Sequence, residues 1–288
     1  MKILLAACNA KYIHSNLAVF NLKAYAKEYD SQVVLREYTI NQLKDDILKD
    51  IYRCHPDVVC VSCYIWNITF VRELMQDLRK ILPDVPFWAG GPEVSYDAET
   101  FLGKNPAFNG VMVGEGEETF LELVKHYVNG SVTLEETRGL VYRKADGALQ
   151  NNGWRQLMDL SKVPFAYENL ENFENRIIYY ESSRGCPFSC SYCLSSIDKK
   201  LRFRDINLVK KELQFFLDQN VKQVKFIDRT FNCDHKHAME IWEYIYKHDN
   251  GVTNFHFEIS ADILREEEIV LLNRFRPGLA QLEIGVQS

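Results

Sequence analysis

The chain has 288 residues, nearly half of them apolar, and its formal net charge is −6. This length allows about two domains with large cores, and the mild acidity argues against a broad nucleic-acid surface, which needs clustered Lys and Arg. No secretory signal precedes the first apolar segment, and no apolar run approaches the length of a membrane span. We therefore expect a cytoplasmic protein. In that compartment its eight cysteines are expected to serve as free thiols or metal ligands more often than to form disulfides.

Residues 1–135 alternate between short apolar runs typical of buried strands and longer helical stretches. Strands are expected over residues 2–8, 32–38, 57–63, 85–89 and 110–113, and helices over residues 17–29, 41–54 and 67–82 and after each of the last two strands. Such alternation with short loops predicts an α/β fold, a doubly wound, Rossmann-like domain with helices on both faces of a parallel sheet. Its ligand is expected beyond the carboxyl ends of the strands.

Three cysteines stand close together with the spacing C-x3-C-x2-C: Cys186, Cys190 and Cys193. Three thiolates can converge on one soft metal centre and leave one iron of a 4Fe-4S cluster open, whereas an electron carrier normally supplies four ligands. The alternatives are buried structural cysteines and a zinc knuckle. Zinc would need a fourth ligand and usually shows C-x2-C pairs or nearby histidines, and none lies beside this run.

The cysteine spacing, with Tyr192 just before the last cysteine, resembles the signature of the radical SAM enzymes. The resemblance implies that the amino and carboxylate groups of S-adenosylmethionine chelate the open iron, with Tyr192 at the cofactor site. It also implies that an electron from an external reductant such as flavodoxin or ferredoxin cleaves the sulfonium to a 5′-deoxyadenosyl radical.

Beyond a hairpin around Asp146-Gly147 and a linker, which together occupy residues 136–175, a second alternation begins. Its strands are expected over residues 176–181, 223–228, 255–260 and 279–286, and its helices over residues 208–220 and 266–275. Under the resemblance, residues 176–288 form a (β/α)6 partial barrel with the active site at the carboxyl ends of the strands. Two further strand–helix units are expected downstream, so the barrel is truncated and this chain by itself need not be active.

The resemblance also places contacts to S-adenosylmethionine at the ends of the barrel strands, where polar groups gather for solvation as well as for function. The candidates after the second, third and fourth strands are Asp228, Arg229, Glu258, Ser260, Glu283 and Gln287. Many members of the family carry a glycine-rich segment after the second strand to fix the amino group, and the segment Asp228-Arg229-Thr230 departs from that pattern.

Loops at the carboxyl ends of the first-domain strands are rich in glycine, which lets backbone approach a bulky ligand closely. Residues 9–16, 90–93 and 114–117 resemble the cobalamin-binding domain that precedes the barrel in many radical SAM proteins. The set implied at cobalamin is Asn9, Tyr12, His14, Ser15, Ser62, Trp66, Gly90, Gly91, Pro92, Glu93, Gly114, Glu115 and Gly116. By themselves these glycines are equally consistent with ordinary turns.

His14 departs from the D-x-H-x-x-G pattern that supplies an axial histidine in the mutases and methionine synthase. It lacks the Asp two residues before it and the Gly three residues after it. We therefore expect base-off cobalamin without histidine ligation, and we expect His14 to make ordinary hydrogen bonds in its loop.

Other cysteines and histidines have simpler interpretations. Cys60 and Cys63 imitate a C-x-x-C pair, but residues three apart in a strand point to opposite faces, so both are expected to pack as small apolar side chains. His235 and His237 are expected in a solvated loop or at a helix start rather than at a metal.

Together these features predict a cobalamin-dependent radical SAM enzyme that acts on an unidentified small molecule or peptide. Radical methyl transfer or a related carbon-centred reaction is the expected activity, with the protein supplying orientation and a dry site. In methyl transfer, a substrate radical takes the methyl group of methylcobalamin, and a second S-adenosylmethionine restores it.

Two alternatives stay open. RNA methylthiotransferases also set an α/β domain before a radical SAM barrel, and they bind a second cluster through three cysteines of the first domain. Cys8 and Cys63 lie near suitable strand ends, but Glu37 to Ile40 stand where a third cysteine would follow the second strand. The other alternative is a non-catalytic cofactor-binding or electron-transfer protein. Iron per chain and an assay of S-adenosylmethionine cleavage separate the three.

Overall fold

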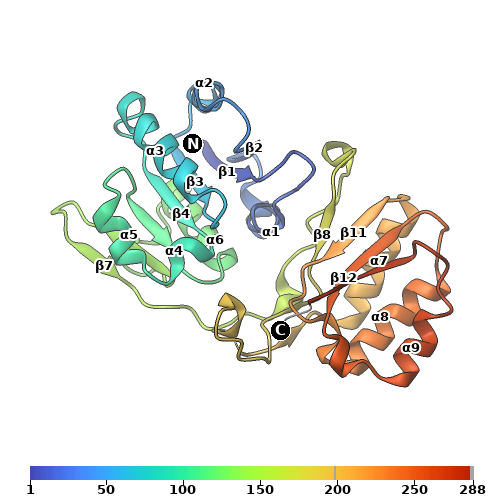
Figure 1. Ribbon diagram of the computed structural model, residues 1–288. Helices are drawn as coiled ribbons and strands as arrows, with labels where there is room; N and C mark the ends of the chain where they lie inside the picture. The colour runs from blue at the N-terminus through green and yellow to red at the C-terminus, as the bar shows by residue number, and fades with distance from the viewer. Residues whose placement is uncertain (198, 286–288) are drawn as a thin grey trace. The chain divides into compact units, whose positions relative to one another are not determined.

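The computed structural model describes residues 1–197 and 199–285, so the candidate Gln287 lies outside the described residues. The chain divides into two compact units (Figure 1). Unit 1 comprises residues 1–158 and 163–169, and unit 2 comprises residues 159–162 and 170–288. The short segment 159–162 therefore belongs to unit 2, although the residues on both sides of it belong to unit 1.

Unit 1 is built on a seven-stranded sheet of order β2-β1-β3-β4-β5-β6-β7. Its parallel strands are β1 (Ile3–Asn9), β2 (Val33–Thr39), β3 (Val58–Ser62), β4 (Phe87–Gly90) and β5 (Gly110–Met112). The expected hairpin, β6 (Leu140–Arg143) and β7 (Leu149–Asn151), extends this sheet as two antiparallel strands instead of standing apart from it. The strand order reverses beside β1, which puts the expected ligand site at the ends of β1 and β3.

Helices cover both faces of this sheet, as predicted. They are α1 (Leu17–Tyr25), α2 (Lys44–Cys54), α3 (Ile68–Ile81), α4 (Pro92–Ser95), α5 (Ala98–Lys104) and α6 (Glu117–Asn129), with a 3-10 turn at Lys27–Tyr29. Alternate residues of β1 enter two different cores, Leu4 on one face and Leu5 on the other. Cys60 and Cys63 likewise pack into opposite cores, which confirms their expected role as buried apolar side chains.

Unit 2 contains the four expected parallel strands in the order β13-β12-β11-β8. They are β8 (Ile178–Tyr180), β11 (Gln223–Phe226), β12 (Asn254–Ile259) and β13 (Ala280–Ile284). The helices are α7 (Ile206–Asp218), α8 (His235–Lys247) and α9 (Glu266–Leu272). Short 3-10 turns lie at Leu160–Lys162, Glu171–Phe173, Leu194–Ser196, Phe231–Cys233 and Ala261–Ile263.

Helix α8 extends well beyond the helix start expected at His235. The Asp234 side chain caps it by accepting a hydrogen bond from the backbone N of His237 at 2.9 Å. Ala238, Ile241, Trp242 and Ile245 are buried at helical spacing. This periodicity was present in the sequence, so the helix could have been predicted in full.

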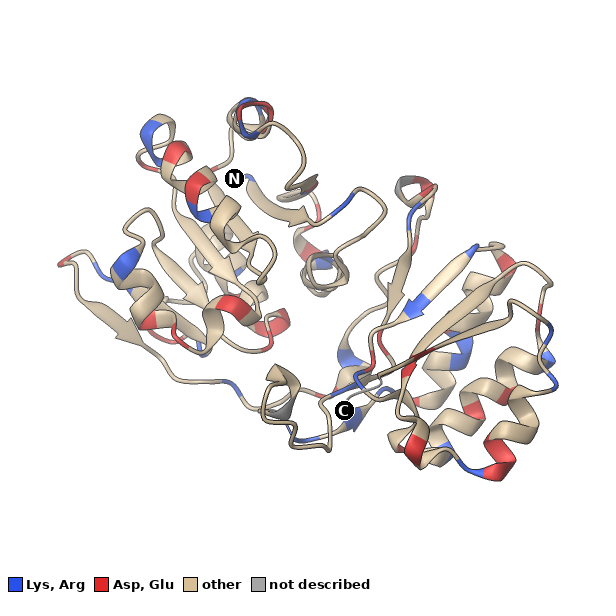
Figure 2. Cartoon of the chain, viewed as in Figure 1, with Lys and Arg blue, Asp and Glu red and all other residues tan. Residues whose placement is uncertain are grey.

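Charged residues are mixed over the surface of both units. Figure 2 shows Lys and Arg interspersed with Asp and Glu along the helices. Within the described residues, no helix combines the length and the apolar character that crossing a bilayer requires.

Candidate cofactor sites at the strand ends

A partly buried polar network shapes the loop after β1. The Nδ2 of Asn9 donates hydrogen bonds to the carboxylate of Glu37 on β2 (2.8 Å) and to the carbonyl of His14 (3.0 Å), and Glu37 also accepts from the backbone N of Asn16 (2.8 Å). These bonds fold residues 10–15 back toward β2. Glu37 was not among the predicted site residues, because its partners come from a different strand and loop.

Ser62, at the end of β3, belongs to the same edge of the sheet. Its hydroxyl accepts from Asn16 Nδ2 at 3.2 Å, and Asn67 Nδ2 bridges the carbonyls of Cys8 (2.9 Å) and Ser62 (3.1 Å). The structure thus brings together the predicted residues Asn9, Ser62 and buried Ser15. Two predicted aromatic residues stay on the surface here, Tyr12 with 71% and Trp66 with 49% of its area exposed.

Gly90 and Gly91, at the end of β4, differ in whether the surrounding structure would tolerate a side chain. Gly91 has φ +111°, and a Cβ there would lie 2.5 Å from the carbonyl oxygen of Cys63, so the protein's own backbone requires glycine at this position. At Gly90 a Cβ would meet Met112 at 3.5 Å, which is an ordinary contact. Pro92 and exposed Glu93 begin helix α4. The protein's own packing therefore explains the glycine at position 91 but does not explain the glycine at position 90.

A segment beyond the hairpin covers the loop after β5. At Gly114, where φ is +76°, a Cβ would lie 3.0 Å from the Trp154 ring, and the ring of Trp154 also contacts that of Tyr96, with centroids 5.4 Å apart. The Glu115 carboxylate accepts from the backbone N of Met158 at 3.0 Å, and a Cβ at Gly116 would meet Leu22. The predicted residues Gly114 and Glu115 thus lie under residues 154–158, which the sequence did not link to the site, whereas Gly116 faces Leu22 of α1.

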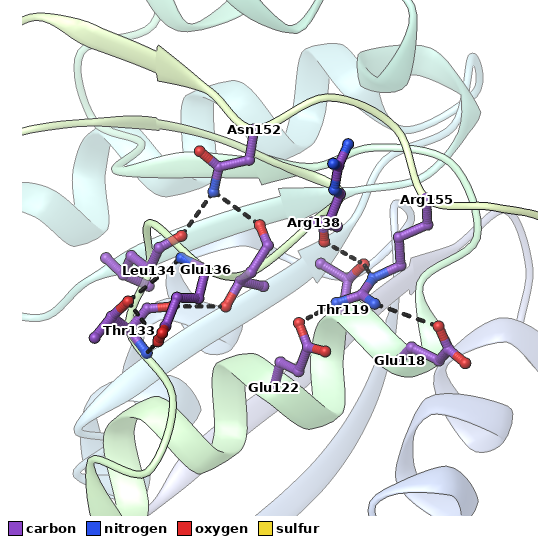
Figure 3. A network of polar contacts seen from close by, with 10 residues as sticks. Glu118, Thr119, Glu122, Thr133, Leu134, Glu136, Arg138, Asn152 and Arg155 are labelled. Atoms are coloured by element: carbon purple, nitrogen blue, oxygen red, sulfur yellow. Dashed lines mark hydrogen bonds and ion pairs between the residues drawn. The ribbon is translucent and has the colours of Figure 1, made fainter.

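Arg155 anchors this covering segment to helix α6. Its Nε donates to the Thr119 hydroxyl at 2.8 Å, its Nη1 to Glu118 at 3.3 Å and its Nη2 to Glu122 (Figure 3). Only 13% of the Arg155 side chain is exposed. The Glu118 and Glu122 side chains are 40% and 31% exposed, so solvent still screens these ion pairs in part.

In unit 2, a short antiparallel pair closes the base of the cysteine loop. Strands β9 (Ser183–Arg184) and β10 (Arg202–Phe203) pair across it, and the backbone N of Arg204 donates to the Ser182 carbonyl at 2.9 Å. Gly185, with φ +95°, passes so close to Lys200 that a Cβ would lie 2.5 Å from the Lys200 carbonyl oxygen. The turn before Cys186 therefore needs glycine.

The three cysteines of the loop sit at different depths. Cys186 is buried at the base, Cys193 is half-buried and Cys190 is exposed, and the backbone N of Cys193 donates to the Cys190 carbonyl at 3.1 Å. Tyr192 is 76% exposed. All eight cysteines are free thiols, and in residues 1–197 and 199–285 no three His, Cys, Asp or Glu side chains stand as a ready-made metal site. Three free thiols on one short loop fit a cluster as a donor set, since cysteine thiolates are the ligands that hold iron–sulfur clusters.

Asp228 is turned toward the base of this loop. Its carboxylate accepts from the Ser182 hydroxyl (2.6 Å) and backbone N (3.0 Å) and from the Ser183 hydroxyl (2.6 Å). Burial raises the pKa of Asp228 to about 6, although the three donors oppose the shift. His237 Nε2 lies 3.1 Å from the same Ser182 hydroxyl. Arg229, the next predicted residue, is exposed.

The remaining predicted residues of unit 2 divide into two groups. Glu258 and Glu283 stand opposite each other on β12 and β13, and both reach Lys225 Nζ on β11, at 3.5 Å and 2.7 Å. Ser260 lies apart from them, with its hydroxyl donating to Asp262 at 2.5 Å. Lys225 was not predicted as a site residue, because only the strand register brings its ammonium group within reach of both carboxylates.

A buried ion pair holds the far side of the cysteine loop. The guanidinium of Arg204, just after β10, donates to the Glu212 carboxylate on α7 and to the Leu160 carbonyl at 2.6 Å. Glu212 also accepts from the Tyr180 hydroxyl of β8 at 2.6 Å. A strand end, a helix and the segment 159–162 are thus joined at one point.

Comparison with known families identifies both units. The family model of the B12 binding domain matches residues 3–124, and that of the radical SAM superfamily matches residues 180–288. The chain is a radical SAM protein with a B12-binding domain. The strand ends of the B12-binding domain carry the Asn9 and Gly90 loops, and the radical SAM domain carries the cysteine loop.

Several curated proteins resemble this radical SAM protein. An uncharacterized methyltransferase of Pyrococcus horikoshii is 30% identical over 206 residues, which are 68% of this chain and 44% of that protein. The cobalamin-dependent radical SAM methyltransferase TokK of Streptomyces tokunonensis is 26% identical over 73% of this chain and 33% of TokK. The anaerobic magnesium-protoporphyrin IX monomethyl ester cyclase of Rubrivivax gelatinosus is 24% identical over 90% of this chain and 49% of the cyclase. The chain thus spans half the length or less of these relatives.

Among solved structures, the chain is similar to OxsB, a cobalamin-dependent S-adenosylmethionine radical enzyme with aqua-cobalamin and S-adenosylmethionine bound. The TM-score is 0.80 over 100% of this chain and 44% of OxsB, at 19% identity. This likeness establishes a shared fold.

Proposed function

We propose that the protein is a cobalamin-dependent radical SAM enzyme that transfers a methyl group by a radical route to a small molecule or peptide. The observation that carries this proposal is the cysteine loop, with its base held by β9 and β10, on the same chain as a B12-binding domain. The similarity to TokK, a methyltransferase by name, supports methyl transfer. The similarity to the cyclase over 90% of the chain keeps a related carbon-centred reaction as the second candidate.

In this proposal Cys186, Cys190 and Cys193 hold a 4Fe-4S cluster, which with S-adenosylmethionine supplies the radical that starts the reaction. The protein's own part is positioning. Gly185 sets the turn that delivers Cys186, and Asp228 holds Ser182 and Ser183 in place ahead of it. The group formed by Lys225, Glu258 and Glu283 offers both signs of charge to polar atoms of S-adenosylmethionine or substrate.

Cobalamin is assigned to the strand ends of unit 1, in the base-off form and without a histidine ligand. The exposed rings of Tyr12 and Trp66 suit the apolar faces of a corrin, and Gly90 allows close approach of a ligand without any internal requirement for glycine. We also assign the protein to the cytoplasm, with flavodoxin or ferredoxin as electron donor, because eight free thiols suit a reducing compartment.

The test is anaerobic reconstitution with iron, sulfide and cobalamin, followed by absorption spectra, iron counts and an assay of S-adenosylmethionine cleavage. The wild type should hold about four irons, as a single cluster requires. The variant with Cys186, Cys190 and Cys193 all changed to Ala should lose the iron and the cleavage, whereas Cys54→Ala should keep both. If the triple variant retained the iron, the assigned ligands would be wrong.

The same iron count addresses the methylthiotransferase alternative, which needs a second cluster in the first domain. Burial raises the pKa of the Cys8 thiol to about 12 and raises that of Cys63 as well, so forming the thiolates that a cluster needs costs more free energy at these two positions. About eight irons per chain would favour that alternative. Transfer of labelled methyl from S-adenosylmethionine to cobalamin and then to a product would distinguish methylation from other radical chemistry.

A further inference from the structure

Cys186 has a hydroxyl neighbour of its own. The Thr230 Oγ1 lies 3.7 Å from the Cys186 Sγ, within the reach of a hydrogen bond to sulfur. Both side chains are buried, with 8% of each residue exposed. Thr230 follows β11, whereas Cys186 follows β9, so the contact joins residues 44 positions apart in the sequence.

Two hydrogen bonds to the Asp228 carboxylate hold this contact in place. Asp228, two residues before Thr230, accepts a hydrogen bond from Ser183 at 2.6 Å, and Ser183 lies three residues before Cys186. The Ser182 hydroxyl adds a second bond to the same carboxylate, also at 2.6 Å. The segment after β11 and the start of the cysteine loop therefore meet twice within a few residues, and Asp228 acts as the positioning residue for Thr230.

The chemistry of the pair is decided by the state of the sulfur. A cysteine that binds iron is a thiolate and has no proton to donate, so the Thr230 hydroxyl must be the donor and Cys186 the acceptor. Hydrogen bonds to cluster sulfurs and the solvent exposure of those sulfurs are among the factors that set the reduction potential of an iron–sulfur cluster. Reduction adds negative charge to the cluster, and a donor at the sulfur stabilises that added charge.

We propose that the Thr230 hydroxyl donates a hydrogen bond to the Cys186 sulfur when the cluster is bound, and that this bond raises the reduction potential of the cluster. Thr230 is then a tuning residue that makes the cluster easier for an electron donor to reduce. This inference rests on the proposed function, because it requires Cys186 to be a cluster ligand.

The test is a reductive titration of the reconstituted protein without S-adenosylmethionine, followed by electron paramagnetic resonance. Thr230→Val keeps the shape of the side chain and removes the hydroxyl, so its midpoint potential should be more negative than that of the wild type. We expect at least a tenfold change in the ratio of reduced to oxidised cluster at a fixed potential, which is about 59 mV for one electron. Iron content should stay at the wild-type level.

Thr253→Val is the matched control. Thr253 is a fully buried threonine of the same unit, just before β12, and its hydroxyl also has a hydrogen-bond partner, Asn250 at 2.9 Å. It lies at the amino end of the strand, away from the cysteine loop, so this variant should lose some stability and leave the midpoint potential unchanged. A shift as large as that of Thr230→Val would overturn the proposal, since it would show a general packing effect.

Two smaller substitutions make the test independent of how well valine fits. Thr230→Ser keeps the hydroxyl and should retain the wild-type potential, whereas Thr230→Ala should show the shifted one. If Ser and Ala shifted equally, or if Thr230→Val kept both the iron and the wild-type potential, the inference would fail while the proposed function stood. A wild type that binds no cluster would overturn both.

Discussion

At the scale of single residues, Asp228 is a carboxylate that the fold retains at a cost in stability. Its three hydrogen bonds come from Ser182 and Ser183, and burial still raises its pKa from 3.8 to about 6. The folded protein therefore binds this proton more tightly than the unfolded chain does. The resulting stabilisation is fully present below pH 3.8 and is lost as the pH rises through 6. A buried carboxylate that lowers stability near neutral pH suits a role in positioning the cysteine loop.

The substitution Asp228→Asn should reveal how much stability the ionised Asp228 carboxylate costs. The difference in the free energy of unfolding between the variant and the wild type should move in favour of the variant as the pH rises from about 4 to about 7, by about 2 kcal/mol. Urea unfolding at several pH values measures it. Because Asn cannot accept a hydrogen bond from the Ser182 backbone N through its NH2 group, cluster assembly should be impaired even where stability improves. A difference that does not change with pH would show that Asp228 keeps an ordinary pKa.

Gly91 and Gly103 allow a paired test of why particular glycines are present. Gly91→Ala places a Cβ at φ +111° and 2.5 Å from the Cys63 carbonyl, so the free energy of unfolding should fall by about 1–3 kcal/mol without any ligand. Gly103 lies exposed in helix α5 with nothing within 4 Å of an added Cβ, and Gly103→Ala should raise stability by about 0.5–1 kcal/mol. Thermal unfolding without cobalamin would show both, and equal effects of the two substitutions would contradict this explanation.

At the scale of elements, the Arg204–Glu212 pair joins β10, α7 and β8 through one buried contact. Only 8% of the Arg204 side chain and 6% of the Glu212 side chain are exposed, so each charge depends on the other for its solvation. The Leu160 carbonyl is bound at the same point. The pair therefore fixes where the cysteine loop returns to the sheet.

Arg204→Met should lower the free energy of unfolding by about 3–5 kcal/mol, because it leaves the Glu212 carboxylate buried without its partner. Changing both residues, to Met and Leu, should recover much of this loss. Lys247→Met removes an exposed partner of Glu243 and should change stability by less than about 0.5 kcal/mol. Chemical denaturation of the wild type and these three variants measures the changes, and a double variant no more stable than Arg204→Met would argue against a charge effect.

At the scale of the whole molecule, cobalamin is assigned to unit 1 and the iron–sulfur cluster to unit 2, so the two should be lost separately. Gly90→Leu fills the space that we assign to cobalamin and should weaken cobalamin binding at least tenfold, or by about 1.4 kcal/mol, while iron content stays normal. Gly103→Leu, at a glycine with open surroundings, is the control. The triple cysteine variant should show the reverse, losing iron and keeping cobalamin. Equilibrium titration and iron analysis would measure both, and joint loss of the cofactors in either variant would contradict separate sites.

Local sequence patterns determined the fold class and the cysteine loop. The alternation of apolar strands and helices repeats over short distances, and strand residues such as Leu4 and Leu5 carry the pattern of a sheet buried on both faces. The C-x3-C-x2-C spacing is local as well, so the sequence alone indicates that these cysteines can share one metal centre. The full extent of α8 was readable in the same way from the periodicity of Ile241 and Trp242.

Only the tertiary structure decided which polar groups meet. Glu37 reaches Asn9 across β1 and β2, Lys225 contacts carboxylates of two other strands, and Thr230 meets Cys186 from 44 residues away. Asp228, predicted from its place after a strand as a cofactor contact, accepts hydrogen bonds from Ser182 and Ser183, which the sequence did not link to it. The physical reason is that strand order and register set these distances, and they depend on the packing of the whole sheet, whereas periodicity and spacing along the chain record only local geometry.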